Sequence, residues 1–297
     1  MEIVVDSENN KRIDAYLSSK LEYSRSKIEK MLEDGLILID GKKIKRSYVP
    51  KAGDIIAVTE PEVKQMNVEA ENIPLDIVYE DEDVIIVNKG NGMVVHPAVG
   101  NNNGTLVNAL LFHSKNLSNV NGEFRPGIVH RIDAYTTGLL MIAKNDKAHE
   151  ELAKELSISK TKRKYIALVW GVINEDTATI DAPIGRDSTD RKKMAITSNG
   201  KDAITHLKVL ERYKNATLVE LTLETGRTHQ IRVHMNYIGH PVVNDPVYGR
   251  RKLIDNTGQC LHAKTIGFTH PRTHKYMEFT SELPECFINI LNKFKEE

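Results

Sequence analysis

The chain has 297 residues, of which 40% are hydrophobic and 28% are charged, and its formal net charge is zero. This composition is that of a folded globular protein, and no apolar run approaches the roughly 20 residues that cross a membrane. The N-terminus has no signal-peptide pattern, and Cys260 and Cys286 have no metal-site spacing, so a reducing cytoplasm is the expected location.

The neutral total hides an uneven distribution of charge along the chain. Residues 61–100 carry 2 basic and 8 acidic side chains, whereas residues 101–297 carry 28 basic and 22 acidic ones. Residues 25–51 hold 8 basic and 4 acidic side chains. Basic faces of this kind are compatible with a nucleic-acid partner, although charge alone fits an ordinary solvated surface equally well.

Residues 12–60 are expected to form a small αβ domain. Apolar side chains spaced four apart predict one helix, and a second helix is expected to begin at the N-cap Ser24 and to end at Gly35. Asp40-Gly41 is a strong hairpin-turn signal. The strands of this domain are expected at residues 36–39 and 55–58.

The segment SRSKIEKMLEDGLILIDGKKIKRSYVPKAGDII, residues 24–56, resembles the small RNA-binding domain found in a small-subunit ribosomal protein and in many RNA-modifying enzymes. This resemblance implies that basic side chains on the helix and the hairpin contact RNA phosphates, which supplies affinity and orientation but little sequence readout. The alternative is a solvated helix and hairpin. The basic residues concerned are Arg25, Lys27, Lys30, Lys42, Lys43, Lys45 and Arg46.

Residues 61–74 are polar, acidic and flanked by prolines, which is typical of a linker. A second domain is expected over residues 75–297. Thr105 is the predicted cap of a helix in it, and many strands with few helices indicate a mixed α+β domain built on antiparallel sheet. The predicted strands lie at residues 83–88, 139–143, 165–170, 204–210 and 216–223.

The most informative string is GIVHRIDAYTTGLLMIAKN, residues 127–145, in which Asp133 lies close to His130 and Arg131. A short polar segment before a buried strand can hold a reactive side chain on a rigid scaffold. A carboxylate in such a position can act as a nucleophile in glycosyl chemistry. An isolated aspartate with this spacing would more often cap a turn.

A second informative string is TGRTHQIRVHMNYIGHPVVNDPVYG, residues 225–249. Thr228 is the expected cap of a helix whose apolar face contains Ile231 and Met235. Arg232 lies on another stripe of this helix. A guanidinium there could pair bidentately with a carboxylate and favour its ionised form, or it could simply contact a phosphate.

The string at residues 127–145 resembles the signature HRLDxxTSGLLxxAK of the Rlu-type pseudouridine synthases, which act on large-subunit ribosomal RNA. The resemblance extends from about Arg12 to about Pro284. It implies a catalytic domain with a bisected, mainly antiparallel sheet and a central cleft. It also implies isomerisation of uridine to pseudouridine in large-subunit ribosomal RNA, with RNA as the partner and no cofactor.

The same resemblance assigns catalytic roles to individual residues. Asp133 corresponds to the essential carboxylate, although the sequence does not say whether it attacks C1′, attacks the base or removes a proton. Arg232 corresponds to the arginine that pairs with this carboxylate. Tyr165 corresponds to a tyrosine next to the uracil, where an aromatic face suits a flipped base.

Three further residues are expected to contact the RNA. Arg131 would help to hold the target nucleotide out of the stack. Leu261, in the string LHAKTIGFTHP, would lie against the base as well as pack in the core. His130 would either contact the substrate or be packed and hydrogen-bonded within the protein.

Departures from the family pattern lie next to the expected carboxylate. Ile132 replaces a common leucine, and Ala134-Tyr135 replaces an often charged pair, so the choice of target could differ. His229 and His234 are five residues apart and lack an acidic third ligand, so no metal site is expected. The open alternatives are a non-catalytic RNA-binding or ribosome-assembly protein on the same fold, and a synthase acting on transfer RNA. A monomer with no membrane partner is expected.

Overall fold

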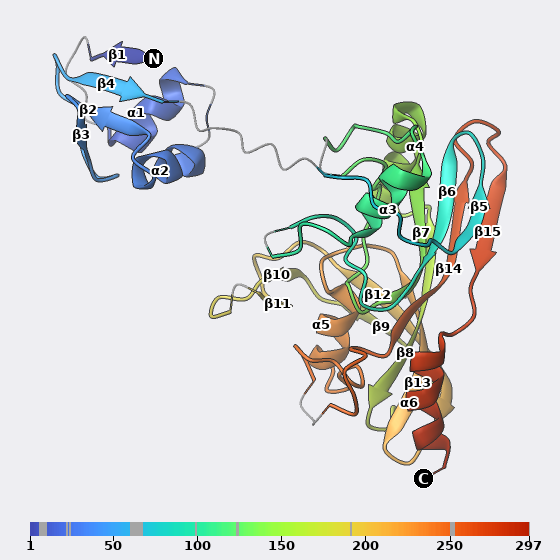
Figure 1. Cartoon of the computed structure of the whole chain (residues 1–297). Helices are drawn as coiled ribbons and strands as arrows, with labels where there is room; N and C mark the ends of the chain where they lie inside the picture. The colour runs from blue at the N-terminus through green and yellow to red at the C-terminus, as the bar shows by residue number, and fades with distance from the viewer. Residues whose placement is uncertain are drawn as a thin grey trace. The chain divides into compact units, whose positions relative to one another are not determined.

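The computed structural model describes residues 1–5, 11–21, 23, 25–59, 68–98, 100–122, 125–190, 192–249 and 253–296. The chain divides into two compact units, Met1–Gln65 and Met66–Glu297 (Figure 1). Both units combine helices with sheets that are mostly antiparallel, so the expected α+β class is confirmed.

The first unit is a four-stranded antiparallel sheet, in the order β1-β4-β2-β3, with two helices. Its buried apolar side chains come from both helices and from β2 and β4 and form one core. The elements are β1 (Glu2–Val4), α1 (Ile13–Lys20), α2 (Arg25–Glu33), β2 (Ile37–Ile39), β3 (Lys42–Lys43) and β4 (Ile55–Val58).

The turns of this unit follow the local signals in the sequence. Gly35 ends α2 with φ 75°, and Asp40 and Gly41 join β2 to β3 with φ 45° and 75°. Positive φ at both central residues is what a two-residue hairpin turn of this kind requires, so both predictions are confirmed. The expected N-cap Ser24 lies outside the described residues.

The second unit is built on a nine-stranded sheet in the order β5-β6-β7-β14-β8-β13-β12-β9, with β15 paired to β14. All five strands predicted for this unit are present; the predicted strand at residues 216–223 agrees at both ends, and the boundaries of the other four differ by at most three residues. The strands are β5 (Ile77–Glu80), β6 (Val84–Lys89), β7 (Thr137–Ala143), β8 (Lys162–Trp170), β9 (Thr177–Asp181), β12 (Ile204–Arg212), β13 (Ala216–Leu223), β14 (Leu261–Thr269) and β15 (Tyr276–Thr280), and β10 (Ile184–Arg186) and β11 (Met194–Ile196) form a separate hairpin.

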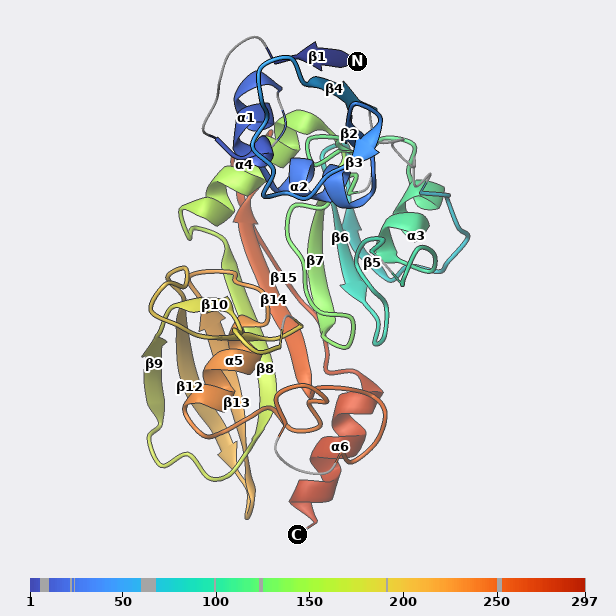
Figure 2. The same cartoon turned by 90° about the vertical axis from the view of Figure 1, so that its left-hand side faces the viewer.

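β7 and β14 are neighbouring strands in the interior of the sheet and lie side by side in Figure 2. Among the described strands of this sheet, theirs is the one parallel pairing. Gly138 pairs with Ala263 at a φ of 106°, and a Cβ there would lie 2.3 Å from the Ala263 carbonyl oxygen. Only glycine allows this approach. The contact joins β7 to β14 directly after the segment that contains Asp133.

Four helices accompany this sheet: α3 (Leu106–His113), α4 (Asp146–Ser157), α5 (Gln230–Tyr237) and α6 (Glu285–Lys295). Thr105 caps α3 in a capping box with Asn108, as expected. Ile231 and Met235 of α5 pack in the core with residues of β8 and β13, and Figure 2 shows α5 over that half of the sheet. No helix among the described residues is long and apolar enough to cross a membrane.

The predicted cap Thr228 is wrong, because α5 begins two residues later. His229 occupies the N-cap position with φ 56° and makes no side-chain cap bond. The side chain of Gln230 accepts the Arg227 N–H at 2.9 Å, a donor of the segment that precedes the helix.

Residues 60–67, which include the first half of the expected linker, lie outside the described residues. The second half is attached to the larger unit. The Asn108 side chain donates to the carbonyl of Glu69 at 2.7 Å, and the Glu71 carboxylate accepts the Gly104 N–H at 3.0 Å. Residues 68–74 therefore run along the start of α3.

Candidate active site

A cavity of about 570 Å³ opens on one face of the second unit, beside the segment between α3 and β7. Its walls come from that segment, from α4, β8 and α5, and from the start of β14. All six residues predicted for the catalytic and substrate-binding site of this unit line it: His130, Arg131, Asp133, Tyr165, Arg232 and Leu261.

Asp133 and Arg232 form an ion pair in the wall of this cavity. The Nη1 atom of Arg232 donates to Oδ2 of Asp133 at 2.7 Å. Arg232 is 5% exposed, whereas the side chain of Asp133 is 26% exposed. Among the described residues none donates a hydrogen bond to Oδ1 of Asp133, so this oxygen is available to a substrate.

The other side of the Arg232 guanidinium is held by Asp245. Nε and Nη2 of Arg232 donate to its two carboxylate oxygens at 2.7 and 2.8 Å. Asp245 also accepts the backbone N–H groups of Val247 and Tyr248. Burial opposes the charge on Arg232, but the bonds to Asp245 and Asp133 outweigh it and raise the pKa of Arg232. The guanidinium is thus a fixed, permanently charged support for Asp133.

His229 faces the second oxygen of Asp133, with Nε2 lying 3.7 Å from Oδ1. The Tyr248 hydroxyl accepts the N–H of Met194 at 2.8 Å and lies 2.8 Å from Nδ1 of His229. The hydroxyl proton is therefore assigned to the bond with Nδ1, which leaves the ring proton on Nε2, directed at Asp133. Burial lowers the pKa of His229 despite the opposing effect of Asp133, which favours this neutral ring.

Lys89 lies beneath the segment that contains Asp133. It is 1% exposed, and its Nζ donates to the carbonyl of Gly90 at 2.8 Å and to that of Ala134 at 2.7 Å. Burial lowers the pKa of Lys89 to about 7, although the nearby Asp133 carboxylate acts in the opposite direction. The lysine fixes the backbone next to Asp133 rather than entering the cavity, whose wall does not include it.

His130 and Arg131, which both precede Asp133 in the chain, have different surroundings. His130 accepts the backbone N–H of Met141 on Nε2 at 3.1 Å, which fastens the segment to β7. Arg131 is exposed at the rim of the cavity, and its guanidinium donates to the ring of His96 at 3.4 Å. The position of Arg131 suits a contact with an RNA strand, whereas His130 is already engaged within the protein. Their predicted contacts with RNA stay predictions.

The floor of the cavity is apolar. Tyr165 on β8 is 7% exposed and pairs across the sheet with Ala263 on β14 and Leu221 on β13. Burial raises the pKa of the Tyr165 hydroxyl. Leu261, at the start of β14, is 5% exposed and lines the same cavity. Tyr165 and Leu261 therefore contribute apolar surface to the cavity that Asp133 also lines.

The sequence reasoning missed three residues that complete this site: Lys89, His229 and Asp245. Two of them carried a signal. Asp245 lies 13 residues after Arg232 in the same string, and a lysine at the end of the apolar strand of residues 84–89 is unusual, because lysine is almost never fully buried without a partner. Nothing in the sequence shows that Asp245 reaches Arg232 or that Lys89 reaches the carbonyl of Ala134.

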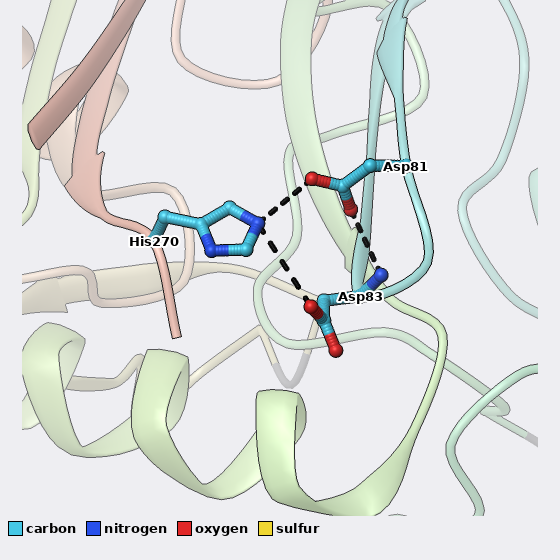
Figure 3. A group of neighbouring side chains, drawn as sticks. All are labelled: Asp81, Asp83 and His270. Carbon is cyan, nitrogen blue, oxygen red and sulfur yellow. Dashed lines mark hydrogen bonds and ion pairs between the residues drawn. The ribbon is translucent and has the colours of Figure 1, made fainter. Parts of the chain in front are cut away.

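Among the described residues, one cluster of possible metal ligands joins Asp81, Asp83 and His270 at the turns between β5 and β6 and between β14 and β15 (Figure 3). Nδ1 of His270 accepts the backbone N–H groups of Arg272 and Thr273, so Nε2 donates to Asp81 at 2.7 Å.

The carboxylates of this cluster are also engaged within the protein. Burial alone would raise the pKa of Asp81, but backbone N–H bonds from Val84 and Asp83 outweigh it and lower this pKa to about 2. Arg272 pairs with Asp83, its Nε lying 2.6 Å from the carboxylate. These hydrogen bonds and this ion pair give the cluster a structural role, because they connect the turn between β5 and β6 to the turn between β14 and β15.

In the first unit, the basic residues named for RNA contact whose side chains are described are exposed on α2, on β3 and in the loop that follows β3. No ion pair involves any of them among the described residues. The side chain of Lys27 lies outside the described part. The exposed residues are Arg25, Lys30, Lys42, Lys43, Lys45 and Arg46.

Comparison with known proteins follows the division into two units. Residues 83–237 match a family model described as RNA pseudouridylate synthase, and residues 11–56 match a model described as the S4 domain. The chain is 51% identical over 292 residues to an uncharacterized RNA pseudouridine synthase of Bacillus subtilis, with 98% of this chain and 96% of that protein covered.

Two further similarities bear on the site. The chain is 42% identical over 289 residues to the ribosomal large subunit pseudouridine synthase D of Pseudomonas aeruginosa, with 93% of this chain and 89% of that protein covered. The solved structure of human RNA pseudouridylate synthase domain containing 1 matches with a TM-score of 0.59 and 26% identity, covering 77% of this chain and 97% of that chain.

Proposed function

The chain belongs to the RNA pseudouridine synthase family, and from this premise we propose that it isomerises specific uridines of large-subunit ribosomal RNA, with Asp133 as the essential carboxylate and without a cofactor. The observation that supports the catalytic assignment most is the asymmetric environment of Asp133. One oxygen is paired with Arg232 at 2.7 Å, whereas the other accepts no hydrogen bond from a described residue, and Asp133 lines the cavity.

The reaction breaks the bond between N1 of uracil and C1′ of the ribose, turns the base and joins C5 to C1′. An ionised carboxylate next to C1′ can attack this carbon or remove the proton that C5 loses. Arg232 orients Asp133 in either case, because its own position is fixed by Asp245. Every atom needed for the product is present in the substrate nucleotide, so the proposal requires no external donor or oxidant.

The cavity suits a nucleotide that has left the helical stack. Tyr165 and Leu261 provide an apolar surface for the base, and Arg131 at the rim can occupy the space from which the base departs. A base inside a duplex cannot reach Asp133, so the substrate must be flipped or already splayed.

Two observations support ribosomal RNA as the substrate. Relatives at about 42% identity carry the name ribosomal large subunit pseudouridine synthase D, and residues 11–56 match the S4 domain. We propose that the exposed basic side chains of α2, β3 and the following loop bind phosphates and bring the ribosomal RNA to the enzyme.

An assay with the purified full chain tests this proposal. Unmodified transcripts of large-subunit ribosomal RNA and of transfer RNA are incubated with the enzyme in the presence of EDTA, and pseudouridine is mapped. We expect modification at discrete ribosomal positions that survives EDTA and is absent with Asp133→Asn. Modification of transfer RNA alone would contradict the substrate, and dependence on a metal would contradict the cofactor-free reaction.

A further inference from the structure

Arg163 on β8 is a buried cation without an acidic partner in the wall of the candidate active site. It is 6% exposed and lines the same cavity as Asp133. Within the described part of the chain no carboxylate forms an ion pair with it. Burying a guanidinium without a counter-charge is costly, so an unpaired one in a cavity calls for an explanation.

The guanidinium of Arg163 has N–H donors that its hydrogen bonds do not use. Its Nη2 donates to the backbone carbonyl of Glu224 at 3.2 Å, and Nε is buried with no hydrogen-bond partner. The contrast with Arg232 is direct, because Arg232 has two carboxylates and uses Nε, Nη1 and Nη2. Burial and the nearby Arg227 lower the pKa of Arg163, which agrees with the lack of a compensating anion.

The backbone makes room for this guanidinium. A Cβ placed on Gly226 would lie 2.5 Å from Nη1 of Arg163, closer than real Cβ contacts allow. Arg227, the next residue, also lines the cavity, and its Nε donates to the carbonyl of Asp202 at 2.8 Å. Two arginines thus meet at one wall, and neither has a carboxylate partner among the described residues.

We propose that Arg163, with Arg227 beside it, binds a phosphodiester of the substrate RNA next to the flipped uridine. A phosphodiester carries a permanent negative charge and oxygen acceptors that match the guanidinium fork. A uracil carbonyl would bond to an arginine but would leave its charge uncompensated. Since Arg163 and Tyr165 are two residues apart on one strand, their side chains share a face, and one strand would hold both the backbone and the base of the target nucleotide. This inference rests on the proposed function, because it deepens the account of the same cavity.

The test combines a protein variant with a change in the RNA. Arg163→Gln removes the charge, and Gly226→Ala displaces the guanidinium while keeping it. Lys162→Gln is the matched control, since Lys162 is the preceding residue on β8, is paired with Glu278 and does not line the cavity. The probe is a synthetic hairpin that contains the mapped uridine, with single uncharged methylphosphonates at each phosphate flanking it.

With the unmodified hairpin, we expect Arg163→Gln and Gly226→Ala to lower kcat/KM roughly 10- to 100-fold, the range for a hydrogen bond to a charged group, and Lys162→Gln to change it little. A methylphosphonate at one flanking phosphate should lower the kcat/KM of the wild-type enzyme by a similar factor. The same methylphosphonate should lower the kcat/KM of Arg163→Gln little further. If the losses of kcat/KM from Arg163→Gln and from the methylphosphonate were fully additive in free energy at every flanking phosphate, the inference would be overturned.

A binding measurement separates failure of this inference from failure of the proposed function. Binding of an unmodified large-subunit ribosomal RNA fragment is followed as a function of salt in the Asp133→Asn background, where no turnover is needed. Arg163→Gln should reduce the slope of log K against log salt by about 0.7 to 0.9, as expected for the loss of one phosphate contact. An unchanged slope would overturn the inference even if the enzyme forms pseudouridine normally. A reduced slope in a protein that modifies no RNA would support the phosphate site and reject the proposed function.

Discussion

The Nη1 atom of Arg232 lies 2.7 Å from Oδ2 of Asp133, and this contact links the catalytic segment before β7 to helix α5. The two residues are 99 positions apart in sequence. Arg232 reaches Asp133 from a fixed position because Asp245 holds its other two donor atoms. The geometry of the proposed catalytic carboxylate therefore depends on an aspartate that does not face the substrate.

The first prediction concerns Asp245. Asp245→Asn keeps the shape but removes the charge that compensates Arg232, and its amide places a donor against a guanidinium. We expect the free energy of unfolding to fall by about 3 kcal/mol, as for a broken buried ion pair, and kcat to fall about 100-fold as Asp133 loses its support. Urea denaturation and single-turnover kinetics measure the two effects.

The matched control for this change is Asp176→Asn. Asp176 pairs with Arg212 at 2.6 Å, but its side chain is 86% exposed. An exposed pair contributes at most about 1 kcal/mol, so stability and kcat should both stay close to wild type. Equal effects of the two substitutions would show that burial of the Arg232 pair is irrelevant.

A second prediction concerns Lys89. Lys89→Met keeps much of the buried volume but removes the bonds to the carbonyls of Gly90 and Ala134. We expect kcat to fall roughly 10- to 100-fold while RNA affinity changes only a few-fold, because the backbone beside Asp133 loses its anchor. Lys144→Met is the control, since Lys144 also donates to a carbonyl, but to that of Asp81 in the turn between β5 and β6 and not to one beside Asp133. A loss of affinity that matched the loss of kcat would contradict a positioning role.

A third prediction uses pH. Burial, with a smaller effect of Arg163, lowers the pKa of His130 to about 3, and Nε2 accepts the N–H of Met141 only while the ring is neutral. In the unfolded chain the ring has a pKa of about 6.5. Below that value the unfolded chain takes up a proton that the folded chain does not. The free energy of unfolding should therefore fall as the pH drops from about 6.5 towards 3.

The variant His130→Gln isolates this contribution, because glutamine can accept the same N–H without titrating. The pH dependence of its unfolding free energy should be shallower than that of wild type, by up to about 1.4 kcal/mol per pH unit between pH 6 and 4. His113→Gln, at an exposed histidine paired with Glu80, is the control for a general effect of losing a histidine. Identical slopes for wild type and His130→Gln would show that this ring is protonated in the folded protein.

The sequence alone predicted the parts of this account that depend on short stretches of chain. The capping of α3 by Thr105 and the turn at Asp40-Gly41 follow from local backbone chemistry, and both are present. The residues predicted around Asp133 all line one cavity. It was the resemblance to a known family that predicted that these residues, distant in sequence, lie close together. Composition and periodicity would not have brought Asp133 and Arg232 together.

What the sequence did not predict depends on tertiary packing. The pairing of Arg232 with Asp245 and the reach of Lys89 to Ala134 join elements whose approach is set by the whole sheet. The cap at Thr228 was wrong because α5 begins at Gln230, and His229, with a left-handed backbone, takes the N-cap position.

A fourth prediction concerns the first unit, Met1–Gln65. Replacing the exposed basic residues Lys42, Lys43, Lys45 and Arg46 by alanine should weaken binding to large-subunit ribosomal RNA and reduce its dependence on salt. The single-turnover rate at saturating RNA should change little, because the cavity lies in the other unit. Replacement of Lys20 and Lys51 by alanine, in the same unit but outside the set named for RNA contact, is the control. An unchanged salt slope would contradict the assignment of this surface to RNA.

The most direct test of the central claim is pseudouridine mapping of large-subunit ribosomal RNA from cells that lack this gene and are complemented with wild type or with Asp133→Asn. We predict that discrete pseudouridines vanish in the deletion strain, return with wild type and do not return with Asp133→Asn, although that variant binds the RNA with an affinity within a few-fold of wild type. Restoration of these sites by Asp133→Asn would contradict the role of Asp133. No change at any ribosomal position in the deletion strain would contradict the proposed substrate.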